Sequence, residues 1–400
     1  MISSVSDLAY FGGTPAFREQ LHVGRPNVGN RNHFIARVND ILERRWFTND
    51  GPYVQEFEKR LALLVGTRHC VATCNATIAL ELVIRASELQ GEVILPSFTF
   101  IATAHALQWH NVVPVFCDVA PHTHHIDPDG IEALITPRTT GIIGVHVWGC
   151  PCNVTMLEDI ARRRRLKLVF DAAHALACTY QGRMIGGFGD AEVFSFHATK
   201  FINSFEGGAI TTNSDDMAQK LRYLRNFGFA EYDRVDDLGI NAKLTEIAAA
   251  MGITSLESMS EVIARNRQNY DTYSRCLSDI PGIMLFRYNQ AEQSNYQYVV
   301  IESEEEVTGI SRDDIVRILH AENILARRYF YPGCHQMEPY RSHYPPAGVL
   351  LPRTASLVTR VMSLPTGTTV TPEQIEKVCD ICRYVVTHGA SIRKLLRALQ

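Results

Sequence analysis

The segment LKLVFDAAHA, Leu166 to Ala175, joins a mainly apolar run to an aspartate. The segment EVFSFHATK, Glu192 to Lys200, joins a second apolar run to a lysine. Runs that stay apolar, instead of alternating with polar residues, are typical of parallel strands covered by helices on both faces. In such sheets ligands bind beyond the carboxyl ends of the strands, which is where both charged residues fall. The two segments therefore predict an α/β sheet with a ligand site at one edge.

The alternation of short apolar runs with helix-like segments extends on both sides, from about residue 55 to residue 215. The strand-like runs are Glu92–Leu95, Val113–Phe116, Thr140–Val147, Leu166–Phe170 and Glu192–Phe196, and the helix-like segments include Thr77–Ser87 and Val154–Arg164. Strands that alternate with helices imply a mostly parallel sheet between two layers of helices. We therefore expect a large α/β domain over residues 1–257.

The pattern changes near residue 256. A long helix-like stretch at Leu256–Asn266 precedes strand-like runs at Ile283–Arg287 and Tyr296–Ile301 and a helix-like stretch at Arg312–Glu322. The chain has 400 residues, which is more than one hydrophobic core normally serves. We therefore expect a second, smaller α+β domain over residues 258–400.

The composition is that of a packed globular protein. Apolar residues make up 46% of the chain and charged residues 20%, and the formal net charge is −4. This balance gives no electrostatic reason to expect nucleic acid or an anionic membrane surface as a partner. The stretch MISSVSDLAYFGG lacks the pattern of a secretory signal, and no apolar run approaches the roughly 20 residues that cross a bilayer. We expect a cytoplasmic protein without nucleic-acid or membrane partners.

Cysteine and histidine spacings argue against a metal site. Cys150 and Cys152 are closer together than the usual zinc-binding pair, and Cys379 and Cys382 lie one helical turn apart with no second pair nearby. The only dense histidine cluster in the sequence, HTHH at His122–His125, falls in a region rich in Pro and Asp that predicts a surface loop. We expect structural cysteines and no metal.

Three polar positions follow predicted strands, and each has two interpretations. Asp171 could keep a pyridine nitrogen protonated or could cap a helix. Lys200 could form an imine with an aldehyde if burial lowers the pKa of its amine, or it could be a surface lysine. The stretch Thr73–Thr77 leads into a helix whose first N–H groups could bind a phosphate, or it could be an ordinary cap.

Taken together, the motifs resemble those of the sugar-nucleotide aminotransferases of the DegT/StrS family. The similarity extends from Gly51-Pro52 to Ser363-Leu364-Pro365 and rests on the order and spacing of the motifs. They are LPSFTFIATAHAL (Leu95–Leu107), PVFCDV (Pro114–Val119), VHVWG (Val145–Gly149), DAAHA, FSFHATK and EGGAITTN. The resemblance implies a fold-type-I, aspartate aminotransferase-like α/β fold with pyridoxal 5'-phosphate (PLP) as cofactor.

The resemblance also implies roles for individual residues. Lys200 would carry the cofactor as an imine and shuttle a proton, Asp171 would pair with the pyridinium nitrogen, and His174 would lie near the 3-hydroxyl group. The other cofactor contacts would be Ala76, Thr77 and Ser195 at the phosphate, Phe100 on the ring face and Asn241 at the phosphate of the neighbouring subunit. A residue that reaches the neighbouring site implies a homodimer. Many relatives have Ser-Gly-Thr where this chain has Asn-Ala-Thr before the helix, so the backbone near the phosphate differs slightly.

The segments YFGG, NFGF, NAKLTE and PGCHQMEPY are most similar to those of enzymes that aminate C4 of dTDP-4-keto-6-deoxyglucose. By this resemblance the amino donor is glutamate. The residues expected to contact the substrate are Phe227, Phe229, Tyr329, Phe330 and His335. Core packing of the four aromatic residues, and a hydrogen-bonded loop histidine at His335, are the alternatives.

Two further functions stay open at this point. One is amination of another ketone by the same family, such as a 3-keto sugar, GDP-4-keto-6-deoxymannose or an inosose. The other, of a different class, is a non-catalytic regulator that binds PLP. Dehydration is disfavoured, because relatives that remove a sugar hydroxyl carry histidine where this chain has Lys200.

Overall fold

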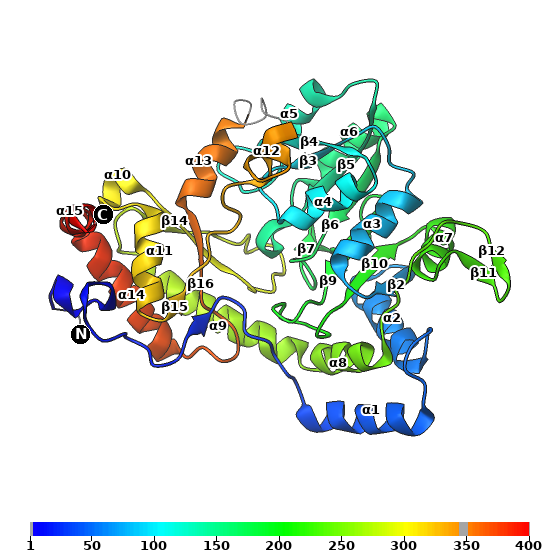
Figure 1. Ribbon diagram of the computed structural model, residues 1–400, viewed down its shortest axis with the longest axis horizontal. Coiled ribbons are helices and arrows are strands. Elements are labelled where there is room, and N and C mark those ends of the chain that lie inside the picture. Colours follow the sequence, from blue (N-terminus) through cyan, green and yellow to red (C-terminus); the bar gives the residue numbers. More distant parts are fainter. Residues whose placement is uncertain (1–2, 344–350, 400) are drawn as a thin grey trace.

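Figure 1 shows the computed structural model, which describes residues 3–343 and 351–399. Its largest sheet has seven strands. In spatial order they are β2 (His69–Thr73), β10 (Gly208–Thr212), β9 (Ala191–Ser195), β6 (Lys167–Asp171), β5 (Thr139–Val145), β3 (Glu92–Pro96) and β4 (Val113–Cys117). Neighbouring strands from β9 to β4 are parallel, whereas β10 runs antiparallel to both β2 and β9. The predicted, mostly parallel sheet is confirmed.

Helices cover both faces of this sheet. Successive side chains of a strand point to opposite faces, so one strand contributes to two hydrophobic cores. In β6, Leu168 and Phe170 join one hydrophobic core, and Val169 between them joins another. The helices of the first core are α2 (Pro52–Val65), α6 (Val154–Arg164) and α8 (Glu246–Glu257), and those of the second are α3 (Ala76–Ala86), α4 (Ile101–Trp109) and α7 (Asp215–Arg225). The strands are therefore buried on both faces, as their apolar sequences indicate.

The C-terminal region builds a separate core on a small antiparallel sheet. Its strands are β13 (Ile283–Leu285), β14 (Val299–Ser303) and β16 (Val361–Leu364), and its helices are α9 (Met259–Leu277), α11 (Arg312–Ala321), α13 (Pro352–Arg360), α14 (Pro372–Thr387) and α15 (Gly389–Ala398). The N-terminal residues Leu8 and Leu21 are buried in this core, and β1 (Leu21–His22) pairs with β15 (Ile324–Leu325). Figure 1 shows the N-terminal segment beside the C-terminal helices. The division into residues 1–257 and 258–400 stays a prediction.

Short elements connect these layers. They are η1 (Val5–Asp7), η2 (Ala9–Phe11), α5 (Pro128–Ile131), η3 (Glu132–Leu134), η4 (Val147–Gly149), β7 (Thr179–Tyr180), β8 (Arg183–Met184), β11 (Phe229–Glu231), β12 (Arg234–Val235), α10 (Glu305–Thr308), η5 (Cys334–Gln336) and α12 (Tyr340–His343). The strands β11 and β12 form a hairpin that projects beside α7 in Figure 1.

The long helix predicted around Leu256–Asn266 is present as α9, but it begins only at Met259, because the chain bends at Ser258 between α8 and α9. The hydroxyl of Ser258 donates to the carbonyl oxygen of Thr254 at 3.5 Å, a side-chain bond that competes with regular helix geometry. Within the described ranges, no single helix is long and apolar enough to cross a membrane. The helices α8 and α9 reach that length and apolarity only as a pair bent by 60°.

The structure also corrects the prediction that His122–His125 form part of a surface loop. His124 and His125 are buried rather than part of a surface loop. His124 Nε2 lies 3.0 Å from the carboxylate of Glu302, and its Nδ1 accepts a hydrogen bond of 2.8 Å from the indole N–H of Trp148. His125 Nε2 lies 2.9 Å from the carbonyl oxygen of Cys150. Partners distant in sequence therefore satisfy both rings, and a local Pro- and Asp-rich pattern does not reveal them.

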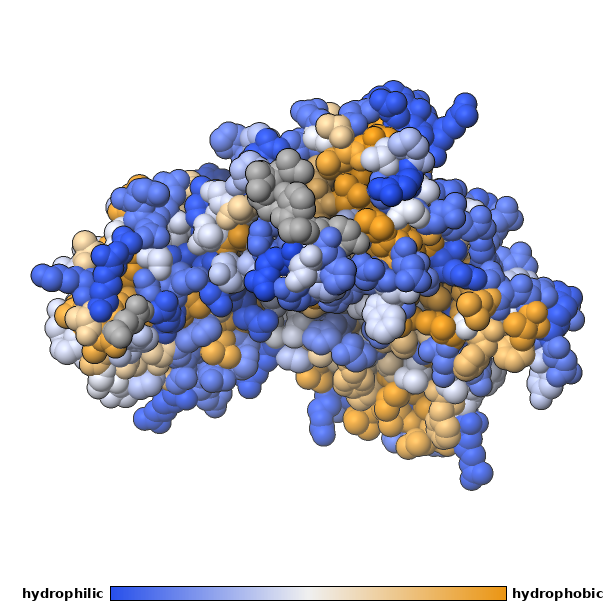
Figure 2. Space-filling view, turned by 45° about the horizontal axis from the view of Figure 1, so that its top comes forward, coloured by the Kyte–Doolittle hydropathy of each residue, from blue (hydrophilic) through white to orange (hydrophobic). Residues whose placement is uncertain are grey.

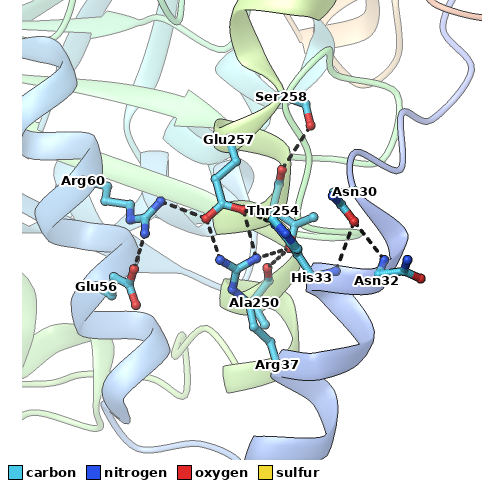
Figure 3. Close-up of polar contacts among 10 residues, drawn as sticks. All are labelled: Asn30, Asn32, His33, Arg37, Glu56, Arg60, Ala250, Thr254, Glu257 and Ser258. Atoms are coloured by element: carbon cyan, nitrogen blue, oxygen red, sulfur yellow. Dashed lines mark hydrogen bonds and ion pairs between the residues drawn. The ribbon is translucent and has the colours of Figure 1, made fainter.

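Helix α1 (Arg31–Arg44) is fastened to the large-sheet core by a polar network (Figure 3). Arg37 donates to the hydroxyl of Thr254 at 2.8 Å and pairs with Glu257 at 2.5 Å. Arg60 of α2 approaches the same carboxylate at 3.2 Å. Figure 3 shows Glu257 between the two guanidinium groups. The network joins α1, α2 and α8. It is needed because α1 buries little apolar surface of its own, with Ile41 as its buried residue.

A buried ion pair holds α7 against α2 and β2. Arg225 pairs with Glu58 at 2.5 Å and donates to the carbonyl oxygen of Ala72 at 2.9 Å. We expect Arg225→Met to lower the free energy of unfolding by about 3 kcal/mol, because it leaves the carboxylate of Glu58 buried without its cation. Urea denaturation measures this change, and Arg222→Ala on the exposed face of α7 is the control. Equal stability of the two variants would contradict the assignment.

Candidate active site

A cavity of about 650 Å³ lies at the carboxyl ends of β6 and β9. Its lining includes every cofactor-binding residue predicted for this subunit's own site, namely Ala76, Thr77, Phe100, Asp171, His174, Ser195 and Lys200. Tyr329 and Phe330 also line it. The structure therefore brings together residues that are as far apart in sequence as Ala76 and Phe330.

Asp171 is the last residue of β6, and its carboxylate is held from two sides. The hydroxyl of Thr103 in α4 donates to Oδ2 at 2.7 Å, and the backbone N–H of Ala173 donates to Oδ1 at 3.1 Å. The side chain is buried. Because both donors stabilise negative charge, the carboxylate is prepared to face a cationic group in the cavity.

Lys200 follows β9 in a short turn, and its amine lies inside the cavity. Its Nζ is 3.4 Å from the hydroxyl of Tyr298. Burial lowers the pKa of Lys200 to about 8, although the charges of Asp171 and Tyr329 oppose this shift. A larger fraction of the amine is therefore neutral near neutral pH than for an exposed lysine, which suits attack on a carbonyl group.

The lowered pKa predicts how fast Lys200 reacts with an electrophile. Below pH 8 the amine is mostly protonated, so the labelling rate of the cofactor-free protein should rise with pH and level off above about pH 8. An ordinary lysine continues to gain reactivity up to a pH of about 10.4. Labelling with trinitrobenzenesulfonate followed by peptide mass spectrometry measures the profile, with exposed Lys59 as the internal comparison. The same profile at both lysines would contradict the prediction.

His174 links the lysine to the wall of the cavity. Its Nδ1 accepts a hydrogen bond of 3.2 Å from the backbone N–H of Trp148, so the proton of the neutral ring lies on Nε2. The Nε2 atom is 3.1 Å from the hydroxyl oxygen of Tyr298 and donates to it. Burial, and then the charge of Lys200, lower the pKa of His174 well below its usual value. The ring is therefore a neutral hydrogen-bond donor.

The opposite end of the cavity is the start of α3. Asn75 caps this helix, and its side chain accepts the N–H of Ile78 at 2.9 Å. The first N–H groups of a helix have no intrahelical partner, and together with the helix dipole they favour an anion. A Cβ on Gly208 would lie 2.6 Å from the carbonyl carbon of Asn75, so only glycine lets β10 run this close to the start of the helix.

Phe100 lies at the start of α4, and 55% of its surface is exposed although it is a large apolar residue. The exposed ring faces the cavity that Asp171 and Lys200 also line. A flat apolar ring at this position can cover one face of a bound aromatic ring.

Four of the predicted site residues lie outside the lining of this cavity. Phe227 and Phe229 are 47% and 38% exposed near the β11–β12 hairpin, which excludes core packing within this chain. Asn241 is exposed and forms a bridge with Asn226 at the base of the hairpin. His335 is buried, and its Nδ1 lies 2.5 Å from the hydroxyl of Ser97. The roles assigned to these four residues stay predictions.

The lining also includes residues that were absent from the sequence-based site, among them Tyr298 and Arg327. Tyr298 comes from the chain just before β14, and Arg327 follows β15. The sequence marks Tyr298 only as part of a strand-like run, so no pattern could have identified it. Arg327 precedes Tyr329 and Phe330, and this proximity to two predicted site residues was the available signal.

Among residues 3–343 and 351–399, no group of three or more His, Cys, Asp or Glu side chains could hold a metal ion. The ten cysteines are free, and Cys379 and Cys382 are buried in α14. Cys152 and Cys178 are buried as well, so the structure agrees with structural cysteines.

Comparison with known proteins agrees with the geometry. Residues 29–383 match the DegT/DnrJ/EryC1/StrS aminotransferase family. A dTDP-4-amino-4,6-dideoxy-D-glucose transaminase from Shigella dysenteriae is 37% identical over 321 residues, which cover 80% of this chain and 87% of that protein.

Solved structures show the same fold. A crystal structure of DesI in the presence of its TDP-sugar product has a TM-score of 0.94 and 48% identity, covering 98% of this chain and 100% of that one. The PLP form of a putative sugar aminotransferase, Spr1654 from Streptococcus pneumoniae, has a TM-score of 0.85 and 25% identity over 92% and 99% of the two chains. The predicted fold type is therefore confirmed.

Proposed function

This chain belongs to the DegT/DnrJ/EryC1/StrS aminotransferase family, and we propose that it aminates C4 of a nucleotide-linked 4-keto-6-deoxyhexose. The substrate is dTDP-4-keto-6-deoxyglucose, the cofactor is PLP and the amino donor is L-glutamate. The observation that carries the proposal is the single cavity in which Lys200, Asp171 and the start of α3 meet. The substrate rests on the likeness to a transaminase named for the corresponding amino sugar and to a structure with a TDP-sugar product.

The side chains of the cavity fit PLP at each end. Thr77, Ser195 and the backbone of Ala76 would hold the phosphate at the start of α3, where the helix dipole favours an anion. Asp171, with both oxygens already hydrogen-bonded, would face the pyridinium nitrogen. His174 would lie near the 3-hydroxyl group, and Phe100 would cover the ring.

Bound PLP supplies an electron sink for the carbon atom that loses a proton. The protein supplies the base. Nζ of Lys200 would remove the proton from the α-carbon of glutamate, whose amino group would pass to the bound cofactor while water supplies the oxygen of the keto acid. In the second half-reaction, the protonated Nζ delivers a proton to the carbon that becomes C4 of the amino sugar. A lysine with a pKa of about 8 can both take and return this proton near neutral pH.

Asp171 and Tyr298 support Lys200 in these steps. The charge of Asp171 favours the protonated amine, which limits the fall in the pKa of Lys200. The hydroxyl of Tyr298, held by His174, keeps Nζ at 3.4 Å on one side of the cavity. The amine is therefore positioned to act on the same face of the substrate in both half-reactions.

A homodimer would explain three of the four predicted site residues that lie outside the cavity. Asn241, Phe227 and Phe229 lie near a projecting hairpin, and they would complete the cavity of a neighbouring subunit. Figure 2 shows apolar surface over the hairpin at the right and over the region of α1 below it. The exposed apolar residues there include Phe227, Phe229, Val235 and Leu238 on the hairpin side and Ile35, Leu42, Trp46 and Phe47 along α1 and after it. A second copy of the chain would cover them.

The dimer proposal makes Asn241 a cofactor ligand in trans. We expect Asn241→Ala to weaken retention of PLP by about 10-fold, because one hydrogen bond to a charged phosphate is lost. Equilibrium dialysis measures the retention, and Asn323→Ala, whose side chain bonds the carbonyl oxygen of Phe17 far from the hairpin, is the control. A fully active monomer in sedimentation experiments would contradict the proposal.

The cysteines support a cytoplasmic location. All ten are free, which suits a reducing compartment. The chain would therefore meet its nucleotide-linked substrate in the cytoplasm.

A substrate panel tests the function. With glutamate as donor, we expect turnover of dTDP-4-keto-6-deoxyglucose to exceed that of GDP-4-keto-6-deoxymannose, a 3-keto isomer and scyllo-inosose. Turnover of scyllo-inosose alone would reject the proposed substrate and leave the aminotransferase family intact. Cofactor binding without turnover of any ketone would favour a regulator instead.

A further inference from the structure

Trp148 lies next to His174 of the cavity wall and has an unusual backbone conformation. Its φ is 64°, in the left-handed region that a residue with a side chain rarely adopts. In this conformation its backbone N–H donates to Nδ1 of His174 at 3.2 Å. A conformation of this kind persists only where the surrounding structure fixes it. The contacts of the Trp148 side chain therefore bear on the hydrogen bond to His174.

The indole of Trp148 is fully buried and is held in two ways. Its ring is stacked on Phe330, with centres 5.2 Å apart and planes 7° apart. At its edge, the indole N–H donates to Nδ1 of His124 at 2.8 Å. Stacking fixes the plane of a ring but leaves it free to slide and turn within that plane. The hydrogen bond to His124 is therefore the contact that sets the direction of the indole.

His124 is itself held by the small sheet. Its Nε2 lies 3.0 Å from the carboxylate of Glu302 in β14, and the same carboxylate pairs with Arg360 at 3.0 Å. Because Nδ1 accepts from the indole of Trp148, the proton of the neutral ring lies on Nε2, which donates to Glu302. The ring is buried and packs against Phe286, with centres 4.9 Å apart. The orientation of His124 and the place of its proton are thus both determined.

The same ordering of donors continues from Trp148 to Lys200. Since the Trp148 N–H occupies Nδ1 of His174, the Nε2 of that ring donates to the hydroxyl oxygen of Tyr298 at 3.1 Å. A hydroxyl has one hydrogen to donate, and His174 leaves it for Nζ of Lys200 at 3.4 Å. A hydrogen bond to the neutral amine favours the neutral form. With its proton on Nδ1, His174 would take the hydroxyl hydrogen instead, and Tyr298 could only accept from Lys200.

We propose that His124 is a positioning residue for Lys200. By holding the indole of Trp148 it keeps the backbone N–H of that residue on His174, and this leaves the hydroxyl hydrogen of Tyr298 to the amine. His124 is not part of the cavity lining, so it acts through Trp148 and not on a ligand. The inference rests on the proposed function, because that function makes the amine of Lys200 the reacting group.

Two substitutions separate the two hydrogen bonds of His124. Both remove the ring, so lost packing is common to them. His124→Asn places an oxygen at the δ position, where it accepts from the indole N–H of Trp148. His124→Gln places its amide at the ε position, where it still donates to Glu302 but leaves the indole N–H without an acceptor. A role through Trp148 therefore predicts that only the glutamine variant disturbs Lys200.

The measurement is the labelling rate of Lys200 by trinitrobenzenesulfonate against pH, in the full-length chain without cofactor. We expect His124→Gln to move the midpoint of this profile up by about 0.5 to 1 pH unit, the equivalent of one hydrogen bond to the neutral amine. His124→Asn should keep the wild-type midpoint. Asp171 and Tyr329, whose charges also act on Lys200, stay in place in both variants. The same two substitutions at exposed His122 are the control and should leave the midpoint unchanged.

Trp148→Phe tests the same link from its other end. It removes the indole N–H and keeps an aromatic ring to stack on Phe330. We expect it to raise the midpoint as His124→Gln does. In a Trp148→Phe background, His124→Asn and His124→Gln should share one midpoint, because the hydrogen bond that distinguishes them is gone and residues that act through one interaction are not additive.

Two results would overturn the proposal. One is a common midpoint for His124→Asn and His124→Gln while Trp148 is present, which would leave His124 with a packing role or none. The other is a larger shift in His124→Asn than in His124→Gln, which would assign the effect to the bond with Glu302. Circular dichroism and melting temperature establish that each variant folds. If a His124 variant does not fold, an unchanged midpoint in Trp148→Phe is the result that rejects the proposal.

The labelling profile is independent of turnover, so the two proposals can fail separately. If the wild type aminates no keto sugar but the midpoints follow the expected order, the proposed function fails and this inference stands. If the wild type aminates the sugar while the two His124 variants share one midpoint, only the inference fails.

Discussion

Replacement of Lys200 by alanine is expected to lower transamination by at least about 10⁴-fold, because one side chain provides both the covalent anchor and the proton-transfer base. Lys200 is the lysine of the cavity lining, and its neutral amine is already favoured by burial. The measurement is the rate of amino-sugar formation from glutamate under saturating PLP, with the product followed by mass spectrometry. Saturating cofactor separates the loss of the base from a loss of affinity.

Lys220→Ala is the control for this experiment, because Lys220 pairs with Glu88 on the surface at 2.7 Å and lies away from the cavity. It should retain full activity. Residual activity of Lys200→Ala within tenfold of the wild type would show that another base moves the proton. In that case Tyr298, whose hydroxyl lies 3.4 Å from Nζ, and His174, which bonds that hydroxyl, would be the first alternatives to test.

Replacement of Asp171 by asparagine is expected to lower turnover by about 10²- to 10³-fold, the usual cost of removing one preorganised charge from an active site. Both carboxylate oxygens accept hydrogen bonds in the protein, from Thr103 and Ala173. An amide presents an NH₂ group to one of these donors and cannot balance a pyridinium charge. The volume of the side chain stays the same, so the loss reports the charge.

The measurement for Asp171→Asn combines turnover with the absorbance spectrum of the bound cofactor. A shift of the spectrum together with slow turnover is the expected result. Asp216→Asn, in the exposed first turn of α7, is the control and should change neither. Normal turnover of Asp171→Asn would mean that this carboxylate does not face the pyridine nitrogen.

The sequence predicts most of the large sheet because buried parallel strands leave a strong pattern. The predicted run Val113–Phe116 falls within β4, and the helix predicted at Val154–Arg164 matches α6. The bend at Ser258 was missed, because one hydroxyl bonded to the preceding turn leaves little trace in an apolar helical pattern. The packing of Leu8 and Leu21 against the C-terminal core is also invisible locally, since it depends on contacts with residues some 300 positions later.

The residues of the candidate site also fall into two groups, those that the sequence reveals and those that only the folded chain reveals. Asp171 and Ser195 end β6 and β9 and Lys200 follows β9, so the sequence places all three at one edge of the sheet, and the resemblance to the family supplies their predicted roles. Tyr298 and Arg327 come from the small sheet, and only the folded chain shows that they reach the cavity.

The identity of the cofactor-bearing residue tests the account most directly. The yellow holoenzyme should be treated with borohydride, which makes an imine link permanent, and then digested and analysed by mass spectrometry. The account predicts the added mass of the reduced cofactor on the peptide that contains Lys200, and on no peptide of the Lys200→Ala variant. Cofactor mass on a different lysine, or a protein that binds PLP without any reducible link, would contradict it.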